Sequence, residues 1–402
     1  MIKTYHQNPR DPEFVQNPNP FYNSVRESGP LFHWAEYGHL CSAEHKTVNA
    51  ILRDRRFGRE APEGFKLTHP LHLKTFYDVE KHSLLELEPP THTRLRSLLV
   101  RAFTNKRIAE LEPEIESLTH ELIDAFPEGE VDLLPVFCEK IPIIIISRLL
   151  GVPEDMADQL IEWSHDMVAM YQVSRDRAVE DAAVKATKEF TDFIRNYVNA
   201  RRNDPREDLI TSLIAATDEG EKMSTDELVT TCILLLNAGH EATVHSFANG
   251  IKALLENSDN PGQYFSTPQD TVKMVEETFR FDPPLHMFTR YAMEDISAFG
   301  HEFKTGDTVG LMLAGANQDP AKFAEPEKLD PVRGGIGNMS FGAGLHFCIG
   351  TPLAKLELSV ALPILFAKYP DMKLAEKPVY ADKYHFHGLD HLKVILGEKH
   401  GT

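Results

Sequence analysis

The 402-residue chain has few cysteines, only two tryptophans and no long hydrophobic run. Its four cysteines are scattered and form no CxxC pair: Cys41, Cys138, Cys232 and Cys348. This spacing argues against both a disulfide framework and a zinc site. The most apolar stretch, residues 141–146, contains Pro142 and is soon followed by Arg148. It is too short to span a bilayer and instead predicts a buried helix.

Basic residues are in deficit, with 42 Lys and Arg against 61 Asp and Glu, which gives a net charge of −19. Such a charge argues against nucleic-acid binding and favours solubility. The first ten residues contain no apolar core, so they do not form a signal peptide. We therefore expect a cytoplasmic protein that has no membrane anchor and acts as a monomer.

The patterning predicts a mainly α fold with small β-sheets. Apolar residues recur three and four apart from about residue 92 to residue 258, which indicates helices. Hairpins are predicted within residues 31–41 and within residues 297–312, the second turning at residues 304–307. We expect one domain over residues 1–402, with a β-rich part at about 1–60, a helical bulk, and a distinctive loop at 341–350.

That loop reads Phe-Gly-Ala-Gly-Leu-His-Phe-Cys-Ile-Gly and places Cys348 among three glycines. A helix is predicted directly after it, with Pro352 in the first turn, where proline is tolerated. Glycine permits tight backbone geometry and the close approach of a bulky group. Backbone N–H groups at a helix N-terminus favour a thiolate, which can be the axial ligand of a flat cofactor such as haem. The alternative is a buried free cysteine in a turn.

The loop resembles the haem-binding loop of cytochrome P-450 monooxygenases, in which a Phe, a Gly, a basic residue, a Cys and a final Gly recur at this spacing. The resemblance implies haem b (iron protoporphyrin IX) with the Cys348 thiolate as the axial ligand. It also implies that Phe341, Gly342, His346 and Gly350 surround the cofactor. The fold implied is the prism of soluble bacterial members of that family, built around a long oxygen-binding helix.

A long helix is predicted from Ser224, where Ser224 and Glu227 form a capping box, to about Leu255. Residues 232–236 are apolar all round, so this part of the helix should be buried. Small residues and a carboxylate follow at 237–243, which indicates either a closely bound ligand or a kink. A packing glycine beside a paired structural glutamate is the alternative.

This segment resembles the family's oxygen-binding motif, Ala-Gly-x-Glu/Asp-Thr, at Ala238, Gly239 and Glu241. Ala242 stands where the threonine is expected, and Thr243 comes one residue, or about 100°, later. The resemblance implies that positions 241, 242 and 243 govern proton delivery to bound dioxygen. Three explanations are open: a substrate hydroxyl or water replaces the threonine, a bulge turns Thr243 inward, or the enzyme is weakly coupled and leaks peroxide.

Glu277 and Arg280 form a Glu-x-x-Arg pair on one face of a predicted helix. Alone, such a pair is most often a solvated surface feature. The resemblance implies a buried structural pair, joined by a third basic residue from a later Pro-x-Arg-Phe segment. Lys328 stands at that basic position, and a lysine lacks the planar fork of arginine.

The resemblance also implies cationic partners for the two haem propionates. The candidates are His92 and Arg96, four residues apart on one helical face, together with Arg290 and His346. Ordinary surface cations are the alternative for each. Substrate contacts are implied for a mostly apolar set: Leu235, Ala238, Leu285, Met287 and Phe288. Core packing is the alternative for any of them.

The activity implied is the insertion of one oxygen atom from O2 into a hydrophobic organic substrate. The sequence contains no flavin or iron–sulfur motif, so electrons should come from NAD(P)H through a ferredoxin reductase and a ferredoxin. We expect the ferredoxin to dock transiently on the cysteine side, at a basic patch formed by Arg101, Lys106, Arg107 and Lys355.

Three other functions are alternatives for this sequence. A haem-thiolate gas sensor or carrier without turnover would fit the missing threonine, but not the retained Glu241. A peroxide-driven oxygenase usually has Arg-Pro at the acid–alcohol positions, which this chain lacks. A zinc or redox-cysteine protein built on Cys348 and His346 lacks further clustered ligands.

Overall fold

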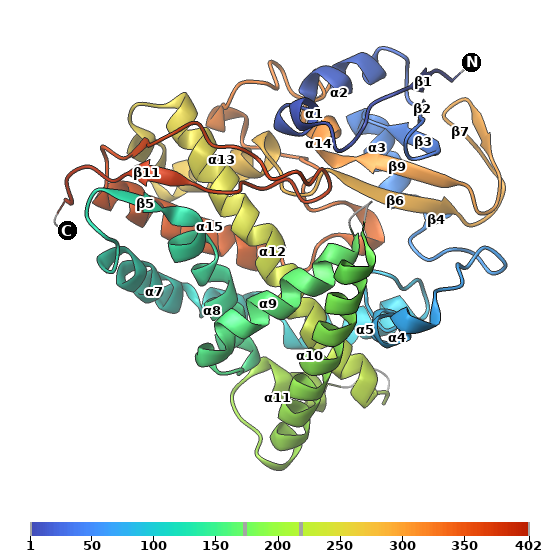
Figure 1. Cartoon of the computed structure of the whole chain (residues 1–402), viewed down its shortest axis with the longest axis horizontal. Helices are drawn as coiled ribbons and strands as arrows, with labels where there is room; N and C mark the ends of the chain where they lie inside the picture. Colours follow the sequence, from blue (N-terminus) through green and yellow to red (C-terminus); the bar gives the residue numbers. More distant parts are fainter. Residues whose placement is uncertain (1, 172–174, 217–219, 401–402) are drawn as a thin grey trace. The chain divides into compact units, whose positions relative to one another are not determined.

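The computed structural model describes residues 2–171, 175–216 and 220–400 (Figure 1). This part of the chain is mainly helical with small sheets, as predicted. It divides into two compact units, which are treated separately below. Unit 1 comprises Met1–Phe65, Ile115–Cys138 and Val244–Thr402; unit 2 comprises Lys66–Glu114 and Glu139–Thr243. The assignment of residues 1–402 to one catalytic domain stays a prediction.

The elements that lie in unit 2, or begin there, are all helical. They are η1 (Leu71–Leu73), α4 (Lys74–Glu80), α5 (Thr91–Ala102), α6 (Asn105–Ala109), α7 (Glu112–Asp124), α8 (Lys140–Leu150), η3 (Glu154–Met156), α9 (Ala157–Val168), η4 (Ala169–Tyr171), α10 (Arg177–Asn203), α11 (Leu209–Ala215) and α12 (Thr225–Asn257). The predicted apolar stretch forms α8, which is buried along most of its length. Helix α10 packs along α9 and buries Phe190, Ile194 and Val198, an apolar stripe at helical spacing.

Helix α12 contains 33 residues, begins in unit 2 and ends in unit 1. Its start confirms the predicted capping box. The Ser224 N–H donates to a Glu227 carboxylate oxygen at 2.8 Å, and the Glu227 N–H donates to the Ser224 hydroxyl at 3.3 Å. Two N–H groups that would otherwise lack partners at the helix start are thereby satisfied.

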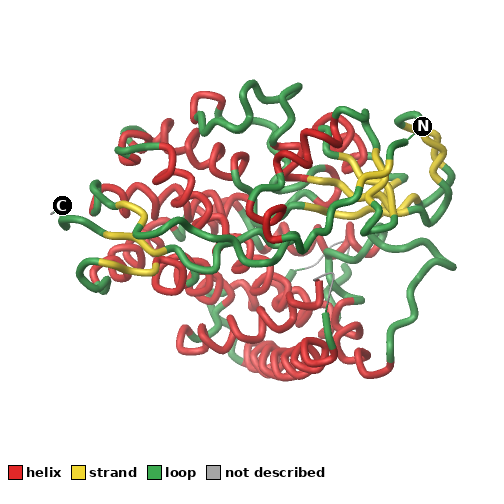
Figure 2. The backbone as a smooth tube through the Cα atoms, turned by 45° about the horizontal axis from the view of Figure 1, so that its top comes forward, coloured by secondary structure: helices red, strands yellow, loops and turns green. Residues whose placement is uncertain are grey.

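Unit 1 contains all the named strands. They are β1 (Thr4–Tyr5), β2 (Phe32–Trp34), β3 (His39–Ser42), β4 (Phe57–Gly58), β5 (Glu130–Asp132), β6 (Met287–Ala292), β7 (Ile296–Ala298), β8 (His301–Phe303), β9 (Thr308–Met312), β10 (Lys373–Leu374) and β11 (Lys393–Ile395). They form a six-stranded sheet, β1-β2-β3-β9-β6-β4, a three-stranded sheet, β10-β11-β5, and the pair β7-β8. Figure 2 shows the strands of the large sheet close to the N-terminal segment.

The first predicted hairpin is confirmed, since β2 and β3 are antiparallel with Phe32 opposite Cys41. The second is wrong in its register. Strands β7 and β8 turn at Phe299–Gly300, and both of these residues have positive φ. Strand β9 instead pairs with β6 and β3, partners that a local turn pattern does not reveal.

Helices are also present in the first sixty residues, which were expected to be β-rich: α1 (Pro12–Gln16), α2 (Asn19–Arg26) and α3 (His45–Arg53). The remaining elements of unit 1 are η2 (Leu134–Cys138), η5 (Pro261–Phe265), α13 (Pro268–Phe281), α14 (Leu313–Asn317), η6 (Pro331–Arg333), η7 (Gly344–His346) and α15 (Thr351–Lys368). An aromatic cluster that includes Phe14, Phe21 and Trp34 joins α1 and α2 to the large sheet. Within the described residues, no helix has the length and apolarity needed to cross a membrane.

Candidate active site

Cys348 lies in the loop between η7 and α15, three residues before the first residue of α15. Its backbone N–H donates to the Phe341 carbonyl oxygen at 3.0 Å, and its carbonyl oxygen accepts a hydrogen bond from the Thr351 hydroxyl at 2.8 Å. Pro352 is in the first turn of α15, as predicted. The backbone around the cysteine is therefore fixed at the N-terminus of an 18-residue helix, where a thiolate is favoured.

Cys348 differs from the other cysteines in its accessibility. It is exposed, whereas Cys41, Cys138 and Cys232 are buried. Burial raises the pKa of the Cys41 thiol, and it raises that of Cys232 to about 12, so those two side chains are inert apolar groups. The alternative of a buried free cysteine therefore does not apply to Cys348.

Two glycines fix the shape of the cysteine loop. Gly342 and Gly344 have φ of 67° and 70°, which L residues rarely adopt. A Cβ on Gly344 would lie 2.3 Å from the Leu52 carbonyl oxygen at the end of α3, so glycine is required there. On the other side, the Phe341 ring packs on the Phe279 ring of α13, with centroids 4.7 Å apart. The loop is thus held between two helices of unit 1.

Strand β6 contributes three of the residues predicted for the site. Arg290 is buried, and its guanidinium donates to the Thr289 carbonyl oxygen at 2.8 Å. Phe288 lies against the cysteine loop, since a Cβ on Gly342 would be 3.8 Å from its ring. Met287, which was also predicted to contact substrate, is buried in the aromatic core cluster, and its contact with substrate stays a prediction. Leu285, just before β6, forms an isolated bridge with Phe386.

The middle of α12 has an unusual accessible stripe. Ala238 is exposed and Ala242 is half-buried, one turn apart, although Leu235 and Leu236 nearby are buried. A Cβ on Gly239 would lie 3.4 Å from Ile146 of α8, so the glycine allows close helix packing on another side. Small side chains thus leave the backbone of a mostly buried helix open on the face that carries positions 238 and 242.

Thr243 does not replace the missing threonine. Helix α12 is continuous through residues 239–243, with no bulge. The Thr243 side chain is buried, and its hydroxyl donates to the Gly239 carbonyl oxygen of its own helix at 3.1 Å. The bulge explanation is therefore wrong, whereas a substitute hydroxyl and weak coupling both stay open.

Glu241 has a partner that the sequence analysis missed. His165 of α9 places its Nε2 3.3 Å from a Glu241 carboxylate oxygen, and Nδ1 of the buried His240 lies 3.8 Å from the same atom. The side chain of His165 is 49% exposed whereas that of Glu241 is only 9% exposed, so the pair links solvent to a buried carboxylate. No local signal marks His165, which lies 76 residues before Glu241 in the sequence.

His92 and Arg96 are both on α5, one turn apart, as predicted. His92 is buried and Arg96 is half-buried. His346, in η7, is also half-buried. Whether these three residues bind propionates stays a prediction.

Glu277 and Arg280 form a buried pair on α13, and both side chains are 0% exposed. Arg280 donates two 2.8 Å hydrogen bonds to the carboxylate. The third basic partner is Arg333, whose Nε lies 3.0 Å from a Glu277 oxygen. Lys328, at the expected basic position, pairs with Glu325 instead and contributes only its carbonyl oxygen to Arg280. The pair is therefore not a solvated surface feature. The planar guanidinium of the third basic partner comes from Arg333, not from position 328.

The residues of unit 1 fit a flat thiolate-ligated cofactor. The exposed thiol of Cys348 stands beside exposed Phe347, and a Cβ on Gly350 would come within 3.7 Å of its sulfur. A buried cation, Arg290, lies on β6 two residues from Phe288, which contacts this loop. An accessible thiol, apolar neighbours and a nearby cation are what haem with its propionates requires.

The basic residues expected at the partner surface differ in their contacts and in their exposure. Lys355 pairs with Glu276, and the Arg107 guanidinium donates to the Ser212 hydroxyl at 2.8 Å. Lys106 has a side chain that is 87% exposed and lies 3.7 Å from Glu110. Lys106 and Arg101 are exposed, whereas Lys355 and Arg107 are half-buried.

Comparison with known proteins agrees with this geometry. The Cytochrome P-450 family model matches residues 59–260 and 271–378. The chain is 32% identical over 403 residues to the polyketide biosynthesis cytochrome P-450 PksS of Bacillus subtilis, covering 97% of this chain and 98% of that protein. It is 34% identical over 360 residues to the 6-deoxyerythronolide B hydroxylase of Saccharopolyspora erythraea, covering 87% and 88%.

Solved structures are equally similar. The structure of P450BioI in complex with hexadec-9Z-enoic acid ligated acyl carrier protein superposes with a TM-score of 0.90 at 29% identity, covering 96% of this chain and 99% of that one. The structure of PksS superposes with a TM-score of 0.87 at 31% identity, covering 98% and 100%. On the family match, the relatives and the fold together, the chain belongs to the cytochrome P-450 family and is a monooxygenase.

Proposed function

We propose that this monooxygenase uses haem b, ligated by the Cys348 thiolate, to insert one oxygen atom from dioxygen into a hydrophobic substrate. The observation that carries the proposal is the exposed Cys348 thiol, fixed at the N-terminus of α15 by the Phe341 carbonyl and the Thr351 hydroxyl. A thiolate ligand favours O–O cleavage when haem is bound.

In this proposal, the surrounding residues bind the haem and keep it in place. Phe341, Gly342 and Gly350 form the apolar cradle of the thiolate. His92, Arg96, Arg290 and His346 bind the propionates. Ala238 offers the open backbone surface of α12, on which a flat group and dioxygen have room because the side chain is a single methyl group.

Protons reach the site through Glu241 in this proposal. The exposed His165 is in contact with solvent and passes protons to the buried Glu241 carboxylate, 3.3 Å away. Ala242 supplies no hydroxyl at the next position, so an ordered water or a substrate hydroxyl completes the path. The catalytic role of the conventional threonine therefore passes to a group outside the chain, and Thr243 takes no part.

The substrate is an apolar acyl or polyketide-type chain. Relatives named for polyketide biosynthesis, and the P450BioI complex with a fatty acyl carrier protein, support this class. In this chain, the large hydrophobic residues Phe65, Leu67 and Leu71 are 51%, 76% and 86% exposed within seven residues, which suits an entrance for such a chain. Leu235, Leu285 and Phe288 are the proposed inner contacts.

Electrons come from NAD(P)H through a ferredoxin reductase and a ferredoxin. Lys106 and Arg101 are the proposed docking cations because both are exposed, whereas Lys355 and Arg107 are half-buried. Reversing both charges to glutamate should slow reduction by ferredoxin and leave substrate binding intact. An unchanged reduction rate would contradict this docking surface.

The deciding experiment is the absorbance difference between the reduced protein and its carbon monoxide complex. We expect a strongly red-shifted Soret band that is lost in Cys348→Ala and retained in the matched control Cys41→Ala. A band like that of histidine-ligated haem in the wild-type protein would overturn the ligation. NADH consumption coupled to product formation then separates an oxygenase from a gas sensor.

A further inference from the structure

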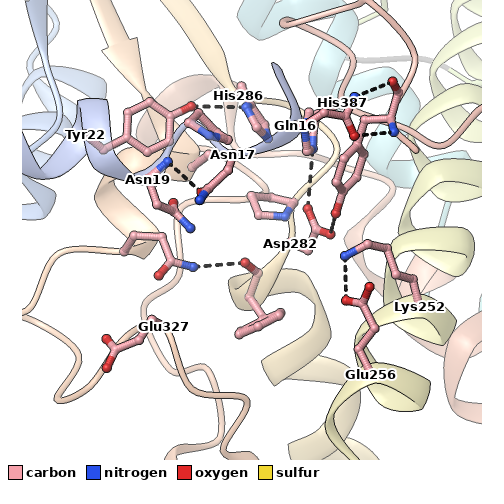
Figure 3. A pocket seen from close by; sticks show the side chains of 16 residues that line it. Gln16, Asn17, Asn19, Tyr22, Lys252, Glu256, Asp282, His286, Glu327 and His387 are labelled. Carbon is pink, nitrogen blue, oxygen red and sulfur yellow. Dashed lines mark hydrogen bonds and ion pairs between the residues drawn. The ribbon is translucent and has the colours of Figure 1, made fainter. Parts of the chain in front are cut away.

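A second cluster of chemically active side chains lies in unit 1, away from the cysteine loop. It lines a cavity of about 200 Å³ to which no residue of the segment 341–350 contributes. The walls come from α1, α2, the ends of α12 and α13, and the C-terminal segment that contains His387 (Figure 3). The monooxygenase activity gives this cavity no role.

Three residues of the cavity can act as ligands to one ion. Asp282, His286 and His387 each offer one nitrogen or oxygen atom, and these atoms lie within 4.8 Å of one another. The two histidines are 2% and 3% exposed. Asp282 directly follows α13, His286 lies four residues later, and His387 comes from a segment a hundred residues away, so the fold brings the three together.

The hydrogen bonds of His387 leave one ring nitrogen available. Its Nε2 donates to the Val15 carbonyl oxygen at 2.8 Å, so Nδ1 of the neutral ring carries a lone pair. That Nδ1 has no hydrogen-bond partner among the described residues and faces Asp282 Oδ1 at 3.5 Å. The gap exceeds a normal N–H···O bond. It matches the separation of about 3.3–3.5 Å between two ligand atoms of a tetrahedral ion with bonds of about 2.0–2.2 Å.

The hydrogen bonds of His286 also leave one ring nitrogen available. The Tyr22 hydroxyl donates to the Tyr384 hydroxyl at 3.1 Å, and its oxygen lies 3.1 Å from His286 Nδ1, where it can accept from the tautomer that is protonated at Nδ1. The lone pair is then on Nε2.

Asp282 completes the set. Tyr380 donates a hydrogen bond to Oδ2, which leaves Oδ1 facing the histidines. Lys252 also lines the cavity and is a possible competing cation, but its ammonium is paired with Glu256 at 2.8 Å.

We propose that Asp282, His286 and His387 bind one divalent transition-metal ion of the Zn²⁺ class. Two imidazoles and one carboxylate form a ligand set of that class, with a further position open to water from the cavity. Histidines that ligate metals usually donate their other N–H to a nearby acceptor, as His387 does to Val15 and His286 does to Tyr22. The ion would join the end of α13 to the C-terminal segment and, through Val15 and Tyr22, to α1 and α2.

The test is equilibrium dialysis of the tag-free, chelator-treated holoenzyme against buffered zinc, with metal analysis and thermal melting as readouts. We expect one zinc ion per chain and a higher melting temperature with zinc. Asp282→Asn and His387→Gln should abolish both effects. Tyr22→Phe removes only the hydroxyl beside His286 and should weaken binding by about 10–100-fold. The matched control, His391→Gln, removes an exposed histidine of the same C-terminal segment and should bind like wild type.

Absence of zinc binding at micromolar free zinc would overturn the proposal. Binding that survives Asp282→Asn, or that is lost equally in His391→Gln, would overturn it as well. Circular dichroism identifies any variant that does not fold; Tyr22→Phe, which alters a single hydroxyl, then decides the question. The carbon monoxide spectrum of each variant should stay unchanged, which separates this site from the proposed thiolate ligation.

Discussion

Replacing Arg280 by methionine should destabilise the protein by about 3–5 kcal/mol, the usual cost of breaking a fully buried ion pair. The guanidinium has no solvent exposure and makes five hydrogen bonds. Two of these go to the Glu277 carboxylate, and three go to the carbonyl oxygens of Asn317, Pro326 and Lys328. Methionine fills similar volume but donates none of them, so a charge and three acceptors lose partners inside the protein.

Glu277 loses only some of its hydrogen-bond donors in this variant, because two others remain. The Nε of Arg333 and the backbone N–H of Asp330 each lie 3.0 Å from its Oε1. For 402 residues, the unfolding entropy is about 0.8 kcal/mol per kelvin, so the expected fall in melting temperature is about 4–6 °C.

The assay is differential scanning calorimetry of the haem-loaded enzyme in matched buffers. The control is Lys328→Met, because Lys328 occupies the basic position expected from sequence but has a side chain that is 61% exposed. It should melt like wild type, whereas Arg333→Met should lie between the control and Arg280→Met. A shift below about 1 °C for Arg280→Met, or equal shifts for Arg280→Met and Lys328→Met, would refute the reasoning.

Three further predictions concern the chemistry and the pH dependence. Ala242→Thr should lower peroxide release per NADH severalfold by placing a hydroxyl on the accessible face of α12, whereas Thr243→Ala should change it little because that hydroxyl is bonded to its own helix. Glu241→Gln should lower kcat by about 100-fold. His165→Gln should lower kcat by less and should raise the solvent isotope effect. If both variants turn over as fast as the wild type, this proton path is excluded. Burial raises the pKa of Glu357 well above its ordinary value, so the folded state favours the protonated form and stability is lost as the pH rises above about 4.5. Glu357→Gln should therefore have a higher melting temperature than the wild type at pH 8. It should also remove a pH dependence of the free energy of unfolding of up to about 1.4 kcal/mol per pH unit. Melting temperatures that change in parallel for the two proteins from pH 5 to pH 8 would contradict this prediction.

The cysteine loop and the start of α12 were predictable because their information is local. Glycines at positive φ, a proline in the first helical turn and a Ser/Glu capping box all act within a few residues of each other. The same holds for His92 and Arg96, whose shared helical face follows from a spacing of four. The proposed thiolate and the proposed oxygen-binding helix are therefore recognisable from the sequence without tertiary information.

Local patterns were misleading where partners are distant. The turn at residues 304–307 was expected to close a hairpin, yet β9 pairs with β6 and β3 because its hydrogen-bonding edges meet those strands in the folded sheet. Met287, a predicted substrate contact, is buried in the aromatic core cluster in the register that β6 adopts. A strand pattern gives alternation, but not which side faces the core.

By itself, the sequence determined the family, the thiolate candidate, and the substitution of alanine at position 242. Only the tertiary structure decided that Arg333 completes the Glu277 and Arg280 network, that His165 reaches Glu241, and that Asp282, His286 and His387 share one cavity. The physical reason is chain separation. These contacts join residues 56, 76 and about 100 positions apart, and such pairs meet only when the whole chain packs, so no spacing rule marks them beforehand.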